Sequence, residues 1–223
     1  MDSIERLTEF FRQFPGIGPR QARRFVYFLL TRDREYVKGL MESVEKVRQS
    51  VSICTSCFRF FTKEKASIHA GVFSSSSICQ ICSDTSRDTS LRMIVAKDAD
   101  LEAVEKSHSY HGLYFVLGGN IPILEKNPEQ KVRLRELNKL MESVGNRASE
   151  DKNNEPKKLK EIILSFSTNS EGEHTTLTIK QILEPFAEAN GFKVSILGRG
   201  LSTGAELEYS DGNTISEALK NRS

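Results

Sequence analysis

Every cysteine of this 223-residue chain belongs to one of two Cys-x-x-Cys pairs. The first pair is Cys54 with Cys57, and the second is Cys79 with Cys82. A turn of this type presents two thiolates to one point, and two such turns complete the tetrahedral ligand shell of a zinc ion. We therefore predict a structural zinc site, because four sulfur ligands leave no open position for catalysis.

Two other interpretations of the cysteines are open. A single Cys-x-x-Cys can be a redox pair, although two pairs with no cysteine left over fit a metal better. His69 lies between the pairs and could replace one thiolate as a ligand, although a loop histidine more often faces solvent.

The stretch FPGIGPRQARR, residues 14–24, suggests a contact with phosphate. Gly16 and Gly18 lack Cβ atoms, so the backbone there can expose N–H groups to a closely approaching anion. A helix that starts at Pro19 adds its positive amino end. Three basic side chains follow at once: Arg20, Arg23 and Arg24. Such contacts hold a nucleic-acid backbone without reading its sequence. The alternative to a phosphate site is an ordinary turn between two helices.

The overall composition is typical of a soluble globular protein, with 38% hydrophobic and 28% charged residues. The formal net charge is only +2, but six arginines and one acid lie between Arg12 and Arg34. Charge concentrated on one element fits a local phosphate contact. No apolar run has the length of a membrane span, and the amino end lacks the apolar centre of a secretory signal, so we expect a cytoplasmic protein.

The amino-terminal part is predicted to be all helical. Apolar residues recur at helical spacing over residues 3–14, 19–31 and 35–50, with Ser3 as the expected cap of the first helix. After the cysteines, apolar runs alternate with helical stretches, which favours a mostly parallel α/β sheet. Strands are expected at 91–96, 112–119, 161–166 and 192–197, and helices at 98–107, 128–144 and 176–190.

We therefore expect four parts: a helical DNA-binding unit over 1–53, a zinc finger over 54–83, an α/β domain over 84–197, and a C-terminal segment over 198–223. Within the α/β domain, the polar stretch 145–158 is expected to be an exposed loop. The C-terminal segment is expected to form a strand, a turn at Asp211 and Gly212, and a helix capped by Thr214.

This order of features resembles the RecR family of bacterial recombination mediators over nearly the full length. FPGIGPRQA resembles one end of the family pattern, and GLSTGAELEYSDGNTISEAL resembles the other. LRMIVAKDADLEAVE, YFVLGG and EIILSFSTNSEGEHT are similar to the family's Toprim domain in order and spacing. The resemblance implies a helix-hairpin-helix unit, a four-cysteine zinc finger and a Toprim-like α/β domain.

The resemblance also implies a function. RecR proteins are not enzymes; they assemble into ring-like homo-oligomers on DNA, which predicts a dimer or a tetramer here. Together with RecO, and in many bacteria RecF, they help to load RecA at single-stranded gaps. A protein of this kind is expected to lie in the cytoplasm with the nucleoid.

Three departures indicate a divergent member of the family. Ala96 stands at the end of the first predicted strand, where Toprim domains normally carry a glutamate. The stretch 58–78 between the cysteine pairs is longer than usual. Asn120 replaces a usual histidine, and residues 121–129 lack the usual Gly-Ile-Gly-Pro.

The rival interpretation is a Mg²⁺-dependent nuclease or primase-like enzyme. Catalytic Toprim proteins bind Mg²⁺ with two acidic residues that are separated by one residue. Glu171 and Glu173 have this spacing. Gly172 between them would let the loop turn tightly. Ala96 can neither transfer a proton nor hold a metal, so no catalytic Mg²⁺ is expected. Glu171 and Glu173 remain a candidate site for weak binding of Mg²⁺ or for binding of a partner protein. A third interpretation is a protein-interaction module whose hairpin merely packs.

Overall fold

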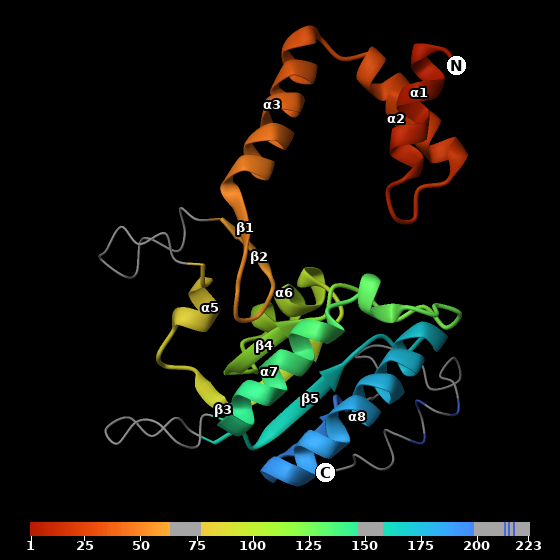
Figure 1. Cartoon of the computed structure of the whole chain (residues 1–223). Helices are drawn as coiled ribbons and strands as arrows, with labels where there is room; N and C mark the ends of the chain where they lie inside the picture. Colours follow the sequence, from red (N-terminus) through yellow and green to blue (C-terminus); the bar gives the residue numbers. More distant parts are fainter. Residues whose placement is uncertain (63–76, 147–157, 199–211, 213, 215, 217–223) are drawn as a thin grey trace. The chain divides into compact units, whose positions relative to one another are not determined.

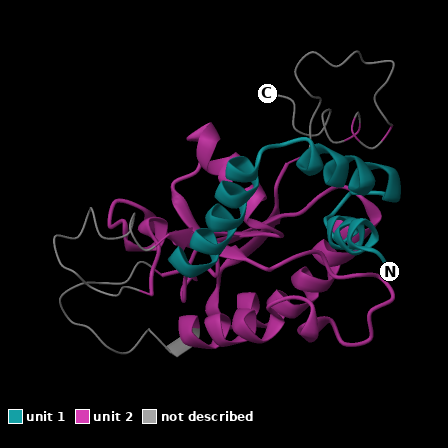
Figure 2. Ribbon diagram, turned by 90° about the horizontal axis from the view of Figure 1, so that it is seen from above, with its two compact units in different colours: residues 1–51 teal, residues 52–223 magenta. Residues whose placement is uncertain are grey.

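The structure is a computed structural model that describes residues 1–62, 77–146 and 158–198, together with residues 212, 214 and 216. The chain divides into two compact units, residues 1–51 and residues 52–223, which Figure 1 traces along the sequence and Figure 2 colours separately. The first unit is helical and the second contains a sheet, in agreement with the fold class expected from the sequence.

The first unit contains three helices: α1 (Ser3–Arg12), α2 (Pro19–Leu30) and α3 (Arg34–Ser50). The cap of α1 is Asp2 and not the expected Ser3, because the Asp2 carboxylate accepts a hydrogen bond of 2.7 Å from the backbone N–H of Glu5. The Glu5 carboxylate accepts in turn from the N–H of Asp2, which completes a capping box.

The helices α1 and α2 pack against each other over a small core. Ala22 and Val26 of α2 are buried, as is Thr8 of α1. The rings of Phe11 and Phe25 meet edge to face, with their centroids 5.6 Å apart. This core contains few residues, so the unit leaves many of its apolar side chains on the surface.

In the second unit, the described residues form a parallel sheet with the strand order β4-β3-β5-β6. The strands are β3 (Asp88–Val95), β4 (Gly112–Val116), β5 (Glu161–Ser165) and β6 (Lys193–Ile196). Val95 pairs with Val116 on one side and with Ser165 on the other, so three strands end level at their carboxyl ends. The predicted mostly parallel sheet is confirmed.

Helices cover both faces of this sheet (Figure 1). The crossovers are α6 (Asp98–Ser107) between β3 and β4, then the 3₁₀ turn η1 (Pro128–Gln130) and α7 (Leu134–Asn146) before β5, and α8 (Ser170–Asn190) before β6. Alternate strand residues point to opposite faces, which separates the core into two clusters. One cluster contains Ile94, Phe115, Leu137, Leu164 and Leu183, and the other contains Met93, Val95, Leu101, Tyr114 and Val116.

Two helix boundaries differ from the prediction. The helix expected over 128–144 is split into η1 and α7. The helix α8 begins at Ser170 rather than at Thr176, because the Asn169 side chain accepts a hydrogen bond of 2.9 Å from the N–H of Gly172. The sequence 171–173 is therefore the first turn of a helix and not a loop.

Parts of two predictions lie outside the described residues. These parts are residues 147–157 of the expected loop, and the strand and most of the helix in the C-terminal segment. Ser216 is helical, as expected, but Thr214, which was expected to cap the helix, is helical as well. Gly212 is helical too, so the helix includes a residue that was expected in the turn.

The backbone of Ser167 approaches Gly172 so closely that this position has no room for a side chain. A Cβ atom at this position would collide with the backbone carbonyl of Ser167, whereas a Cβ at Gly39 in α3 would meet nothing within 4 Å. We expect Gly172→Ala to lower the free energy of unfolding by about 1–3 kcal/mol, because the Ser167 backbone must move. Gly39→Ala is the matched control and should be neutral or stabilising by up to about 1 kcal/mol, because alanine is the better helix former. Thermal denaturation followed by circular dichroism checks both, and a Gly172→Ala variant as stable as the parent would contradict the packing described here.

Candidate nucleic-acid interface and metal centre

The four cysteines converge on one point, as predicted from their spacing. Their sulfur atoms all lie within 4.8 Å of one another, and Sγ of Cys57 is 3.6 Å from Sγ of Cys79. Sulfur ligands 2.3 Å from a tetrahedral zinc ion would be about 3.8 Å apart, so the cluster has the right size. His69 lies outside the described residues.

The four thiols are close enough for the ionisation of one to affect the others. Hydrogen bonds with Cys57, and then with Cys79 and Cys82, hold the pKa of the Cys54 thiol below its ordinary value. The same group of contacts, led by the one with Cys54, raises the pKa of Cys57. Four sulfur atoms in contact cannot all be negative unless a cation compensates them, and thiolates suit a soft or borderline metal ion such as zinc.

Two short elements position the cysteines. The first pair follows β1 (Val51–Ile53), which pairs with β2 (Phe60–Thr62) in a two-stranded sheet. Cys79 is the cap of the short helix α5 (Gln80–Ser83), which carries Cys82. The backbone N–H of Cys79 donates to Sγ of Cys54 at 3.3 Å and so links the two pairs directly.

The first cysteine turn is attached to the edge of the parallel sheet. The N–H of Val116 in β4 donates to the carbonyl of Cys57 at 2.8 Å. The ring of Phe58 meets that of Phe115 edge to face, with centroids 5.3 Å apart. The N–H of Phe60 donates to the Asp98 carboxylate at 2.7 Å. Asp98 therefore joins this turn to α6 in addition to lying in the first turn of that helix.

A buried polar network lies beside α5. Arg87 donates to Glu105 at 2.9 Å, and the hydroxyl of Tyr114 donates to Glu105 at 2.6 Å. Burial alone would raise the pKa of Glu105, but these two hydrogen bonds outweigh it and lower the pKa. Arg87 is thus neutralised within the second unit and is not an open anion site.

The glycine hairpin joins α1 to α2 and leaves the amino end of α2 bare. Gly16 has φ of 75°, a left-handed conformation that favours glycine. Gly18 is the cap of α2 in an extended conformation, and no side chain accepts a hydrogen bond from the first turn. Both glycines have open space where a Cβ would stand. The exposed N–H groups of the first turn are therefore available to an anion.

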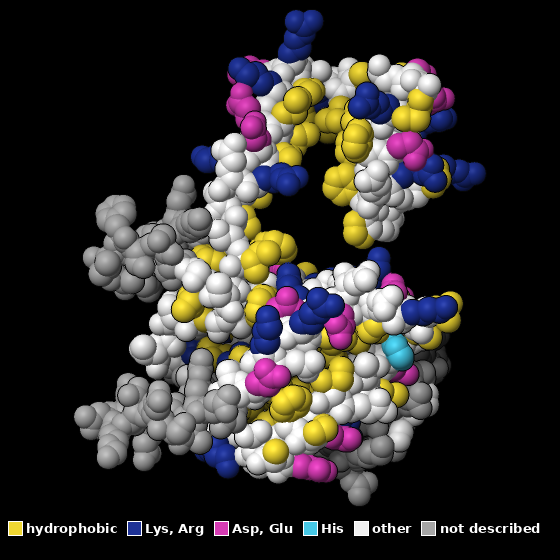
Figure 3. Space-filling view, viewed as in Figure 1, with side chains coloured by type: hydrophobic (Ala, Val, Ile, Leu, Met, Phe, Trp, Pro, Cys, Tyr) yellow, Lys and Arg dark blue, Asp and Glu magenta, His cyan; other side chains and the backbone are white. Residues whose placement is uncertain are grey.

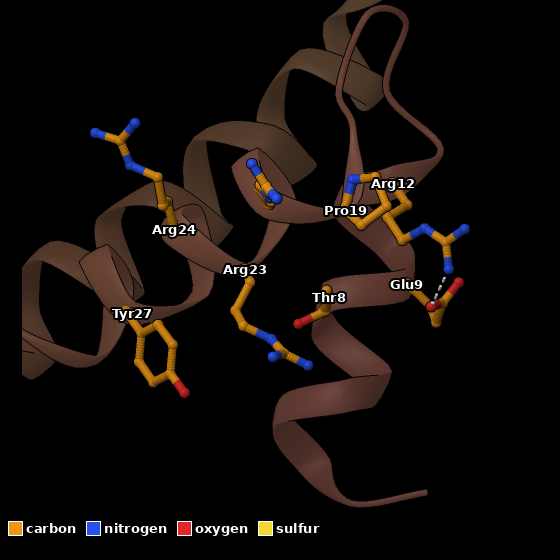
Figure 4. Close-up of a pocket in the computed structure, with 8 residues that line it drawn as sticks. Thr8, Glu9, Arg12, Pro19, Arg23, Arg24 and Tyr27 are labelled. Carbon is orange, nitrogen blue, oxygen red and sulfur yellow. Dashed lines mark hydrogen bonds and ion pairs between the residues drawn. The ribbon is translucent and has the colours of Figure 1, made fainter.

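Arg20, Arg23 and Arg24 line a groove of about 470 Å³ between α1 and α2 (Figure 4). Arg12 lines it too, but its guanidinium is paired with Glu9 at 2.6 Å. The other three arginines have no acidic partner within the described part of the chain; Arg24 reaches only the amide oxygen of Gln21, at 3.5 Å. The sequence analysis missed Tyr27, which lines the same groove one helical turn after Arg23.

The carboxylates expected near the ends of the sheet strands do not form a three-ligand site. Ala96 is buried just after β3, and Glu171 and Glu173 lie in the first turn of α8. Within the ranges that the structure describes, the four cysteines are the only group of three or more side chains that could hold a metal ion together. Asn120 donates to Ser167 at 3.3 Å and so links the loop after β4 to the start of α8.

No helix in the described ranges is long and apolar enough to cross a membrane.

The chain matches family models for a Toprim domain over residues 90–198, for the RecR helix-hairpin-helix over 4–48, and for the RecR C-terminal region over 200–223. The matched ranges agree with the helical unit, with the sheet and its crossover helices, and with the order expected from the sequence.

Curated relatives extend the likeness to the whole chain. A "Recombination protein RecR" of Cyanothece sp. is 34% identical over 98% of this chain and 94% of the relative. Proteins of the same name from Bifidobacterium longum and Legionella pneumophila are each 32% identical, over 99% and 100% of this chain and 95% and 96% of the relatives. This chain belongs to the RecR family of recombination proteins.

Proposed function

We propose that this protein is a non-catalytic mediator of DNA recombination and repair that binds DNA without reading its sequence. The observation that carries the proposal is the bare amino end of α2 beside three arginines without acidic partners in the described residues. Backbone N–H groups, a helix dipole and guanidinium groups all favour a phosphate, and none of them reads a base.

The cysteine cluster supports the proposal from the second unit. We infer that it holds one zinc ion, with Cys54, Cys57, Cys79 and Cys82 as ligands. The elements that carry the cysteines, β1, β2 and α5, are only three or four residues long, so a metal would supply the free energy that keeps the first cysteine turn against β4. Four sulfur ligands leave no position for a substrate, so the role of the zinc is structural.

The non-catalytic assignment rests on the residues at the strand ends. Strand cleavage or primer synthesis through Mg²⁺ needs several carboxylates around the ion. Glu171 and Glu173 have an alanine, Ala96, where the third acid would stand. We therefore assign to the Toprim-like domain the recruitment of RecO-type, and in some pathways RecF-type, partners for loading RecA at single-stranded gaps. This role places the protein in the cytoplasm with the nucleoid.

We further propose that the protein acts as a homo-oligomer. The helix α3 has no buried residue, although apolar side chains recur on one side of it. These are Val37, Leu40, Met41, Val44 and Val47, and the last four are each more than 40% exposed. Figure 3 shows hydrophobic side chains at the surface of the helical unit. Because α3 carries four basic and three acidic residues, its charge does not oppose contact with a second copy.

Replacement of Arg20, Arg23 and Arg24 by alanine is expected to weaken binding to DNA strongly and to flatten its salt dependence. Each phosphate contact that is lost should reduce the slope of log K against log salt by about 0.7–0.9. Fluorescence anisotropy titrations over a series of salt concentrations measure both quantities, and circular dichroism confirms that the variant is folded.

The matched control replaces Lys106, Lys126 and Lys139 by alanine, which removes the same formal charge from exposed positions of the second unit. It should leave the slope nearly unchanged. The proposal fails if the arginine variant keeps the parent's affinity and slope, or if the wild-type protein cleaves or extends labelled DNA in the presence of Mg²⁺ or Mn²⁺.

For the metal, we expect one zinc ion per chain in the purified protein, measured by inductively coupled plasma mass spectrometry. Cys57→Ser should lose the metal and lower the melting temperature, because three ligands hold the ion poorly and the turn loses its support on β4. Ser56→Ala, between the two ligands of the first turn, is the control and should keep the zinc. A metal-free wild-type protein, or one that contains iron, would refute the assignment.

For the oligomer, Met41→Glu together with Val44→Glu should reduce the solution mass, because two charges would be buried in the contact between copies. Size-exclusion chromatography with light scattering gives the mass directly, and a dimer or a tetramer is expected for the wild type. Leu177→Glu, in α8, changes an apolar residue of similar exposure (61% against 68% for Met41) and should not alter the mass. A monomeric wild type, or an α3 variant that keeps its mass, would count against this surface.

A further inference from the structure

Tyr27 belongs to the groove of the helical unit but has a different chemistry from its neighbours there. Arg20, Arg23, Arg24 and Tyr27 of α2 all line this groove, and Arg23 and Tyr27 are one helical turn apart. Figure 4 shows the side chains of Arg23 and Tyr27 on the side of α2 that faces Thr8, whereas Arg24 extends the other way. The groove therefore places a cation and an aromatic ring next to each other.

The ring of Tyr27 has no ring or cation partner among the described residues, in contrast to most aromatic rings of this unit. It is 53% exposed, and no other ring, cation or hydrogen-bond partner contacts its side chain within residues 1–62. Phe28 and Tyr36 are also exposed, but their rings contact each other and the Arg32 guanidinium, which lies 4.2 Å and 5.7 Å from their centroids. Exposure of Tyr27 therefore leaves a flat apolar surface at the groove without any partner inside the unit.

An open ring beside phosphate-binding groups suits an unpaired base. Phosphate gains nothing from an aromatic face, and the bases of a duplex are already stacked on each other. A base of a single strand, however, stacks on aromatic side chains regardless of its identity. Cβ atoms of residues four apart on a helix are about 6 Å apart, so one nucleotide can reach the Arg23 guanidinium with its phosphate and the Tyr27 ring with its base.

We propose that Tyr27 stacks on an unpaired base and makes this groove selective for single-stranded over double-stranded DNA. The inference rests on the proposed function, because the arginines must bring the DNA backbone to the groove. It adds the strand specificity, which phosphate contacts alone do not provide. The stacking uses the ring and not the hydroxyl group, so phenylalanine should replace tyrosine without loss.

The test compares three probes of equal length at one salt concentration by fluorescence anisotropy: an oligothymidylate, a DNA duplex, and a single strand of abasic sites. Tyr27→Ala should weaken binding to oligothymidylate at least fivefold, about the lower limit for loss of one stacked base. Binding to the duplex and to the abasic strand should stay within about twofold. Tyr27→Phe should bind all three probes as the wild type does.

Phe10→Ala is the matched control, because Phe10 is equally exposed, at 56%, in α1 of the same unit but does not line the groove. It should leave all three affinities unchanged. The wild-type protein alone also tests the inference, because it should bind oligothymidylate more tightly than the abasic strand. Equal binding of these two probes, or an equal effect of Tyr27→Ala on single-stranded and duplex DNA, would overturn the inference.

The variant that lacks Arg20, Arg23 and Arg24 distinguishes failure of the base-stacking inference from failure of the proposed function. If the replacement of Arg20, Arg23 and Arg24 abolishes binding to every probe while Tyr27→Ala changes none, the groove binds DNA but Tyr27 does not select the strand. If the arginine variant binds like the wild type, the groove is not the DNA site and both proposals fall.

Discussion

A backbone hydrogen bond from the N–H of Val116 to the carbonyl of Cys57 attaches the first cysteine turn to one edge of the parallel sheet. β4 is an edge strand of the sheet whose residues are all buried, so its open side needs a partner with backbone polar groups. The cysteine turn supplies that partner, and the cluster of four sulfur atoms gives the turn a fixed shape. A metal at the cluster would therefore stabilise the sheet as well as the turn, since Tyr114 and Val116 pack in the same core cluster as the cysteines.

The two units achieve their stability in different ways. The second unit has two core clusters, one on each face of a sheet that is covered by helices. The first unit has a core of few residues and leaves apolar side chains of all three helices at the surface. Small units of this kind bury too small a fraction of their surface to be very stable alone. Contact with another copy along α3 and contact with DNA along α2 would both compensate for this, and they use different helices.

Several contacts hold the start of α8 in the Toprim-like domain. Asn169 caps α8, Gly172 packs closely against the carbonyl of Ser167, and Asn120 reaches across from the loop after β4. These contacts make the region rigid, and they orient the first turn of α8 with its two glutamates.

Local sequence by itself determined the helices at 19–30 and 98–107, the strands of the sheet, and the two cysteine turns, because periodicity, caps and cysteine spacing act over a few residues. Only the tertiary structure decided how other residues are used. The Asp98 carboxylate accepts a hydrogen bond from the N–H of Phe60, which lies 38 residues away in the sequence. Likewise, the pairing of Arg87 with Glu105 and the exposure of Tyr27 beside the groove depend on contacts between separate elements. Charge compensation and exposure are properties of neighbours in space, and a sequence pattern does not contain them.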